Sequence, residues 1–206
     1  MSDRLRVGVL ASGQGTNFQV LVDEANAGSL PIQVVVLVYN NPGALVAKRA
    51  HLSGVPAVLL NHRLYPSREA LDKAIVSTLK AHSVDLVVMA GWMRVVTGVL
   101  IDHYPDRLLN IHPSLLPAFR GNRAIEQALE YGVKVTGCTV HLVRLEVDGG
   151  PVILQQAVPV LDDDTTESLA ERIHAQEYRL LPEAVRLLAS GRVQIEGRRV
   201  RILPDA

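Results

Sequence analysis

The feature of this chain that most constrains its fold is the alternation, across the first half, of apolar β-branched runs with helix-like runs. The clearest run, residues 33–39 (QVVVLVY), is apolar almost without interruption. A strand with one face in water alternates apolar and polar side chains, whereas a parallel strand covered on both faces is apolar throughout. The sequence therefore predicts an α/β fold with helices on both faces of a mostly parallel sheet.

The elements of the first half follow a βαβ rhythm. We expect strands at residues 5–11, 33–39, 57–60 and 86–90, and helices at residues 17–27, 44–53 and 67–82, with Ser67 capping the last helix. Crossovers between parallel strands are right-handed, and repeated crossovers wind helices onto both faces of a twisted sheet. This order predicts a doubly wound, Rossmann-like arrangement.

The second half has a different pattern. Its expected strands cover residues 108–111, 136–142 and 152–160, and its expected helices cover residues 124–131 and 166–190. Residues 192–203 alternate apolar and polar side chains around Gly197, which predicts a C-terminal β-hairpin. The chain has no repeat and no linker, so we expect one domain over residues 1–206, with halves at 1–100 and 101–206.

Composition excludes several classes of partner. Basic and acidic residues number 21 each, so the neutral chain lacks the positive surface that binds nucleic-acid polymers. The single cysteine, Cys138, excludes an internal disulfide, and no paired-histidine metal motif occurs, so we expect no metal. No apolar run reaches the roughly 18 residues of a membrane span. The chain enters its first strand within a few residues of Met1, so we expect a cytoplasmic protein.

The segment from Asn110 to Pro117 (NIHPSLLP) is the strongest candidate for chemistry. In an extended segment, side chains two residues apart point to the same side, so Asn110 and His112 would project together. An amide and an imidazole side by side can stabilise an oxygen that becomes negative during a reaction at a carbonyl. The alternative is a buried histidine satisfied by the backbone, next to an amide that forms a turn.

A second candidate follows the first expected strand and opens a helix, in the sequence SGQGTN at residues 12–17. Glycines let the backbone approach a ligand, and N–H groups at a helix start favour an anion. The pattern is not a full G-x-G-x-x-G and lacks the lysine of a P-loop, so it indicates a monophosphate rather than a dinucleotide or ATP. The alternative is a tight turn with Thr16 or Asn17 as N-cap.

The third candidate, Asp148, precedes the glycine pair at 149–150. Its alternative role is a turn residue, and a catalytic role requires proximity to His112, which sequence spacing does not show. Two titratable groups in different environments can divide proton donation and acceptance. Thr139 and His141 would share one face of a strand, and we expect both to support the site rather than act directly. Cys138 is interpreted as a small buried residue.

Seven segments resemble, in order, the phosphoribosylglycinamide formyltransferases, a folate-dependent family. The matching segments are ASGQGTNFQ (11–19), SREALD (67–72), AGWMRVV (90–96), LLNIHPSLLPAF (108–119), GCTVH (137–141), VDGGPVILQ (147–155) and AQEYRLLP (175–182). One such segment would be weak, but the ordered set spans nearly the whole chain. The resemblance implies a Rossmann-like formyltransferase fold and a single formyltransferase domain. Its first half would bind the nucleotide phosphate, and its second half would hold the catalytic residues and folate.

The resemblance also implies roles for individual residues. The catalytic positions are Asn110, His112 and Asp148, and the positions that hold the substrate ribonucleotide are Gly13, Gln14, Gly15, Thr16, Asn17 and Glu177. The folate-binding positions are Arg68, Met93, Arg94, Val95, Val96, Asn110, Arg144, Leu145, Glu146, Val147 and Asp148.

The implied reaction transfers the formyl group of the co-substrate 10-formyltetrahydrofolate to the amine of glycinamide ribonucleotide, in purine synthesis. Asn110 and His112 would stabilise a tetrahedral oxyanion, while Asp148 orients His112 and relays a proton. Neither a metal nor ATP is required, and no nucleic acid or membrane is implied as a partner. A homodimer is possible, although no apolar stripe demands one.

The chain departs from the family pattern after Phe119. Members often carry Pro-Gly followed two residues later by His, whereas Arg120 and Arg123 stand at those positions here. The added positive charge could interact with the acidic tail of folate or with the substrate phosphate.

Three rival functions are formyltetrahydrofolate deformylase, methionyl-tRNA formyltransferase and a module that binds only phosphate. The first normally has an additional N-terminal domain and the second a C-terminal RNA-binding domain, and we expect neither here. The third would have no reason to keep Asn110, His112 and Asp148 together.

Overall fold

The computed structural model describes residues 4–205 and divides the chain into two compact units that meet between Leu109 and Asn110. The boundary lies inside strand β5 (Leu108–His112). It falls near the expected division at residue 100, and the expectation of one domain stays a prediction. The expectation of a cytoplasmic protein was drawn partly from the residues before the first strand. Of these, residues 1–3 lie outside the described range.

The first unit contains four parallel strands in the order β3-β2-β1-β4. Their bounds are β1 (Leu5–Ala11), β2 (Ile32–Tyr39), β3 (Ala57–Leu59) and β4 (Leu86–Met89). Strand β4 is buried along its whole length, and β2 is buried at six of its eight positions. Consecutive side chains of a strand point to opposite faces, so this burial requires cover on both sides.

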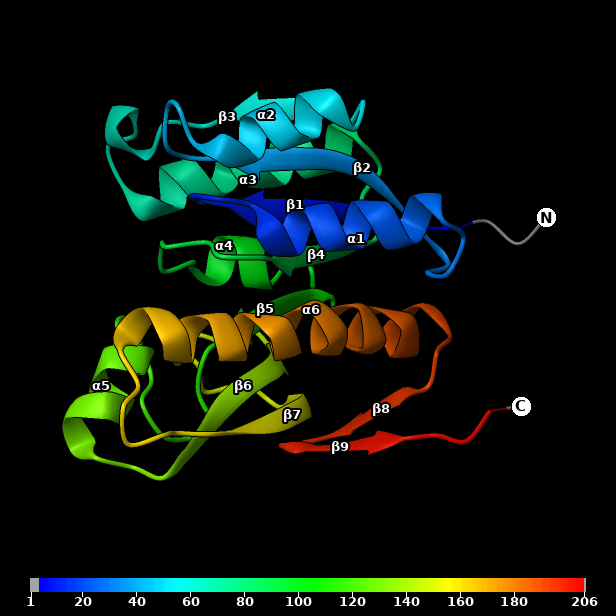
Figure 1. The fold of residues 1–206 in the computed structure, drawn as a ribbon. Helices are drawn as coiled ribbons and strands as arrows, with labels where there is room; N and C mark the ends of the chain where they lie inside the picture. The colour runs from blue at the N-terminus through cyan, green and yellow to red at the C-terminus, as the bar shows by residue number, and fades with distance from the viewer. Residues whose placement is uncertain (1–3, 206) are drawn as a thin grey trace. The chain divides into compact units, whose positions relative to one another are not determined.

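Helices supply that cover. Figure 1 draws α1 (Thr16–Asn26) in front of β1 and α3 (Arg68–Ala81) behind β2, while α2 (Leu45–Leu52) links β2 to β3. Ser67 caps α3 as expected, because its hydroxyl accepts a hydrogen bond from Ala70 N at 3.1 Å. Two short helices, η1 (His62–Leu64) and α4 (Gly98–Ile101), were not predicted, since neither is long enough to show a helical period.

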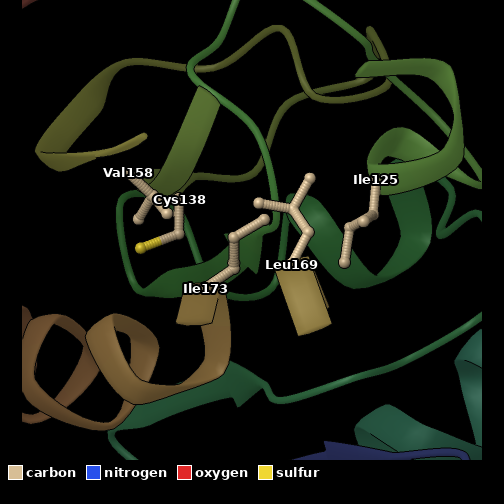
Figure 2. Packing of buried hydrophobic residues seen from close by; sticks show 5 residues of the cluster. All are labelled: Ile125, Cys138, Val158, Leu169 and Ile173. Carbon is tan, nitrogen blue, oxygen red and sulfur yellow. The ribbon is translucent and has the colours of Figure 1, made fainter. Parts of the chain in front are cut away.

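The second unit contains the remaining elements. Strand β6 (Val135–Leu142) pairs antiparallel with β7 (Val152–Pro159), and the terminal hairpin pairs β8 (Val193–Glu196) with β9 (Arg199–Ile202), as expected. Its helices are α5 (Ala124–Tyr131) and the long α6 (Thr166–Ala189). Figure 2 shows a core cluster where α5 and α6 pack against β6 and β7, formed by Ile125, Cys138, Val158, Leu169 and Ile173. Cys138 is thus the buried small residue that the sequence indicated.

The start of α6 is fixed by a reciprocal cap. Thr165 Oγ1 accepts a hydrogen bond from Ser168 N at 3.2 Å, and Ser168 Oγ accepts one from Thr165 N at 3.0 Å. Two helix-terminal N–H groups are thereby satisfied. We expect Thr165→Ala to lower the free energy of unfolding by about 1 kcal/mol, measured by urea denaturation. Thr166→Ala, one position into the helix, is the matched control, and an equal loss in both variants would contradict the capping role.

No helix within residues 4–205 is long and apolar enough to cross a membrane.

Candidate active site

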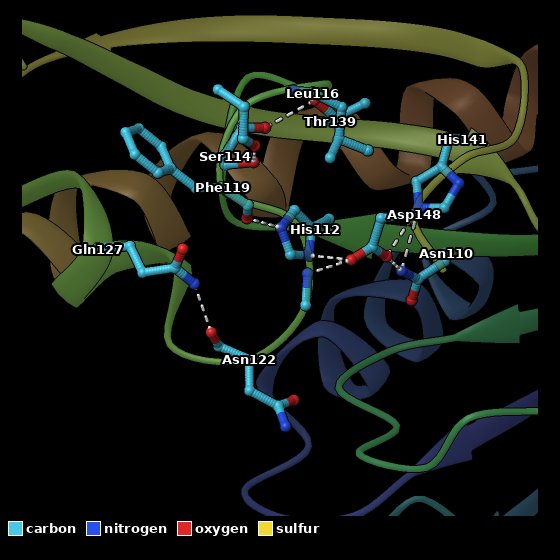
Figure 3. A network of polar contacts seen from close by, with 12 residues as sticks. Asn110, His112, Ser114, Leu116, Phe119, Asn122, Gln127, Thr139, His141 and Asp148 are labelled. Carbon is cyan, nitrogen blue, oxygen red and sulfur yellow. Dashed lines mark hydrogen bonds and ion pairs between the residues drawn. The ribbon is translucent and has the colours of Figure 1, made fainter. Parts of the chain in front are cut away.

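Strand β5 carries the first two candidate residues, and Figure 3 shows both side chains directed toward Asp148, on the same side as expected. The chain after His112 is held by local hydrogen bonds. Ser114 N donates to His112 O at 2.9 Å, and Ser114 Oγ donates to Ala118 O at 2.6 Å. Thr139 Oγ1 on β6 donates to Ser114 O at 2.7 Å. The imidazole is therefore presented by a fixed loop.

Thr139 holds this loop together with Gln155, a residue for which the sequence predicted no role. Thr139 Oγ1 accepts from Leu116 N at 3.1 Å, and Gln155 Nε2 on β7 donates to Thr139 Oγ1 and to Leu116 O, both at 2.9 Å. Gln155 ends one of the family-like segments (VDGGPVILQ). That position was the only signal of its role, because a glutamine in a strand has no distinctive spacing.

Both ring nitrogens of His112 face acceptors. Nε2 lies 2.8 Å from Phe119 O, and Nδ1 lies 3.4 Å from Asp148 Oδ2. A carbonyl oxygen only accepts, so Nε2 carries a hydrogen, and a second proton at Nδ1 would face a carboxylate. Burial lowers the pKa of His112, although Asp148 and the Phe119 carbonyl oppose that shift. Burial therefore favours the neutral form of His112, while the Asp148 carboxylate would stabilise its cation.

Asp148 is the residue that joins the candidates. Gly121 N donates to Asp148 Oδ2 at 2.8 Å, and Oδ1 lies 3.5 Å from Asn110 Nδ2 and 3.6 Å from His141 Nε2. Burial raises the pKa of Asp148, but His141, the Gly121 N–H and His112 together outweigh it and lower the pKa below its usual value. The structure thus brings together residues whose proximity the sequence did not show.

His141 orients the amide of Asn110. His141 Nδ1 lies 3.0 Å from Leu142 O, so this nitrogen carries a hydrogen. Asn110 Nδ2 lies 3.2 Å from His141 Nε2, and this ring nitrogen also lies 3.6 Å from Asp148 Oδ1. The amide nitrogen therefore faces His141 and Asp148, with its second N–H only weakly held by the longer contact to the carboxylate.

In the glycine segment of the first unit, the N-cap differs from the one expected if the segment were only a tight turn. The N-cap of α1 is Gly15 and not Thr16 or Asn17, and no side chain caps this helix. Gly15 has φ +73°, and a Cβ there would lie 2.4 Å from the Val46 side chain. Glycine is required both by the left-handed backbone and by the close approach of α2. The uncapped first turn fits an anion as the natural partner of its N–H groups.

Ser12 ties this glycine segment to the expected folate segment within the first unit. Its hydroxyl accepts from Met93 N at 2.9 Å, and its carbonyl accepts from Asn41 Nδ2 at 2.8 Å. Arg49 Nε donates to Gln14 O at 2.8 Å and holds the far side of the loop. Ser12 belongs to the SGQGTN segment, but its place in that segment did not predict this role.

Two arginines expected at folate positions, Arg68 and Arg94, line one cavity of about 400 Å³ in the first unit. Of the neighbouring expected residues, Met93 and Val95 are exposed and Val96 is buried. The cavity is lined by His62, Tyr65, Pro66, Ser67, Arg68, Glu69, Leu71 and Arg94. Cationic groups around an open cavity suit a carboxylate-bearing ligand.

The remaining expected residues lie in the second unit. Glu177 is buried on α6 beside Cys138, whose thiol pKa is raised to about 12 by burial and by the Glu177 charge. In the segment before Asp148, Leu145 and Val147 are exposed, and Glu146 pairs with Arg120. Arg144 Nη1 donates to Val143 O at 3.0 Å.

Among residues 4–205, no three His, Cys, Asp or Glu side chains converge as metal ligands would.

Comparison with known proteins identifies relatives of this chain. A family model described as formyl transferase matches residues 5–185. A phosphoribosylglycinamide formyltransferase of Mycobacterium tuberculosis is 45% identical over 193 residues, which cover 94% of this chain and 89% of that protein. The trifunctional purine biosynthetic protein adenosine-3 of Homo sapiens is 44% identical over 192 residues. The chain spans 19% of the length of that trifunctional protein.

Solved structures of similar sequence have the same fold. Glycinamide ribonucleotide transformylase 1 from Symbiobacterium toebii superposes with a TM-score of 0.97 at 52% identity, covering 99% of this chain and 96% of that one. Phosphoribosylglycinamide formyltransferase from Bacillus halodurans gives a TM-score of 0.88 at 45% identity, covering 90% and 95%. The predicted doubly wound fold with a C-terminal hairpin is thereby confirmed, and the chain belongs to the formyl transferase family.

Proposed function

We propose that this protein transfers the formyl group of 10-formyltetrahydrofolate to the amine of glycinamide ribonucleotide. The observation that carries the proposal is that Asn110 and His112 both contact the Asp148 carboxylate. The names of the similar proteins from M. tuberculosis and S. toebii support the same substrate. The uncapped glycine turn at Gly15 and the cavity at Arg68 and Arg94 supply groups for a phosphate and for folate carboxylates.

The proposed mechanism begins with attack by the ribonucleotide amine on the formyl carbon. A carbon–nitrogen bond forms, and the carbonyl electron pair moves to oxygen. The weakly held N–H of Asn110 turns to this oxyanion. The attacking amine releases its proton to the His112–Asp148 pair, directly or through water, and the cation formed at His112 faces the Asp148 carboxylate. The proton then passes to the folate nitrogen as its bond to carbon breaks.

The mechanism predicts an acid limb in the pH dependence of kcat/KM. Neutral His112 accepts the proton, and burial holds its pKa below the usual 6.5, so activity should fall only as the pH drops below that value. Because the Asp148 charge raises the pKa of His112, its removal in Asp148→Asn should shift the limb of the residual activity to lower pH. A flat profile between about pH 5 and pH 9, with chemistry rate-limiting, would contradict this assignment.

Product identification tests the proposed function. We expect mass spectrometry to show a formyl group on the ribonucleotide after incubation with 10-formyltetrahydrofolate, and we expect no formate. Formate without modified ribonucleotide would instead indicate a deformylase. If equilibrium titrations showed that the protein binds phosphate but no folate analogue, it would be a phosphate-binding module, and the proposal would be wrong.

A further inference from the structure

The loop after Phe119 and the turn that carries Asp148 are joined at two points. Gly121 N donates to Asp148 Oδ2 at 2.8 Å, and the adjacent Arg120 forms an ion pair with Glu146, two residues before Asp148. Arg198, in the turn of the terminal hairpin, approaches the other oxygen of Glu146 at 4.0 Å. The Glu146 carboxylate thus receives one cation on each oxygen.

Both the backbone and the side chain of Glu146 contact the turn that carries Asp148. Gly149 N donates to Glu146 O at 3.0 Å, which closes the turn around Asp148. Asp148 has φ +51°, a left-handed conformation that costs a non-glycine residue free energy. A Cβ on Gly149 would lie 2.4 Å from Glu146 Oε2, so the carboxylate lies folded over the glycine backbone. The position of Glu146 and the conformation of the Asp148 turn are therefore linked.

We propose that Arg120 and Glu146 are positioning residues, whose ion pair holds the loop after Phe119 against the Asp148 turn and so fixes the Asp148 carboxylate for proton transfer. This role rests on the proposed function. It explains what an arginine does where family members often carry proline. The neighbouring Arg123 lies instead near Glu126 and Glu130, at 3.7 and 3.6 Å, on the outside of α5.

The solvent exposure of the Arg120–Glu146 ion pair determines whether its loss should affect the catalytic rate or the stability. The side chains of Arg120 and Glu146 are 34% and 57% exposed, and an exposed ion pair adds little to stability. Small displacements of a catalytic group nevertheless reduce rates strongly. Loss of the pair should therefore change the rate of the chemical step and leave the melting temperature nearly unchanged.

The test compares Arg120→Ala, Glu146→Gln and the double variant with Arg123→Ala as the matched control. We expect kcat to fall about fivefold in each single variant and by no more in the double variant, with both KM values unchanged in Arg120→Ala. Arg120→Lys should recover most of the rate, and Arg123→Ala should behave as the wild type. A raised KM with unchanged kcat would show that Arg120 contacts a substrate and would overturn the proposal, as would unchanged kcat.

Hydrogen exchange at the Gly121 amide provides a readout that does not depend on activity. If the ion pair holds the loop, exchange should be faster in Arg120→Ala than in the wild type or in Arg123→Ala. Equal exchange in all three proteins would overturn the positioning role. A wild-type protein that fails to transfer formyl would refute the proposed function, while this exchange comparison would still decide the role of Arg120.

Discussion

Replacing Asp148 with Asn is expected to lower the single-turnover rate of formyl transfer by about a thousandfold. The carboxylate lies 3.4 Å from His112 Nδ1 and stays ionised, because its pKa is held below the usual value. An amide of nearly the same shape would remove the charge that stabilises protonated His112 and could not relay a proton. Rapid-quench measurement of formyl loss from 10-formyltetrahydrofolate would give the rate.

Two controls separate this effect from loss of structure. Asp162→Asn makes the same change at an exposed carboxylate, which pairs with Lys134 at 2.5 Å, and its rate should match the wild type. Substrate binding by Asp148→Asn, measured by titration with a folate analogue, should stay within a few-fold of the wild type. A rate for Asp148→Asn within tenfold of the wild type would remove Asp148 from the proton-transfer step.

The second large effect is expected at Asn110. Asn110→Ala should lower kcat by about a hundredfold or more, because it removes the donor for the oxyanion, and the loss of one such donor costs roughly 3 kcal/mol. KM values should change little, since the interaction strengthens only as negative charge develops. Steady-state kinetics with both substrates varied would separate the two parameters.

The matched control is Asn122→Ala, which removes an exposed amide from the neighbouring loop. Figure 3 shows that the Asn122 side chain points away from the cluster around Asp148. Its kinetics should equal those of the wild type. If Asn110→Ala raised KM and left kcat unchanged, Asn110 would bind the ground state and would not act as an oxyanion donor.

Much of the fold could be predicted because local patterns determine it. The run at residues 33–39 became part of β2, buried on both faces, and the alternation around Gly197 became the β8–β9 hairpin. Ser67 proved to be an N-cap, because its hydroxyl acts on an amide only three residues away. The N-cap of α1 was not predicted, since the packing of Val46 against Gly15 depends on a helix thirty residues later in the chain.

The candidate site could be predicted only in part. Spacing placed Asn110 and His112 on one side of a strand, but the contact of Asp148 with His112 depends on how β5 and the turn after β6 come together. The groups that complete the site include the Phe119 carbonyl and the Gly121 amide. Backbone groups leave no trace in residue identity, so no motif could have indicated them.

The central claim is that this protein transfers the formyl group directly to an amine held beside Asp148, and a single-turnover experiment tests it most directly. Excess protein would be mixed with 10-formyltetrahydrofolate, with and without glycinamide ribonucleotide, in the wild type and in Asp148→Asn. We expect formyl loss only when the ribonucleotide is present, and we expect Asp148→Asn nearly to abolish it. Equal formyl loss without the ribonucleotide, or no loss with it, would contradict the account.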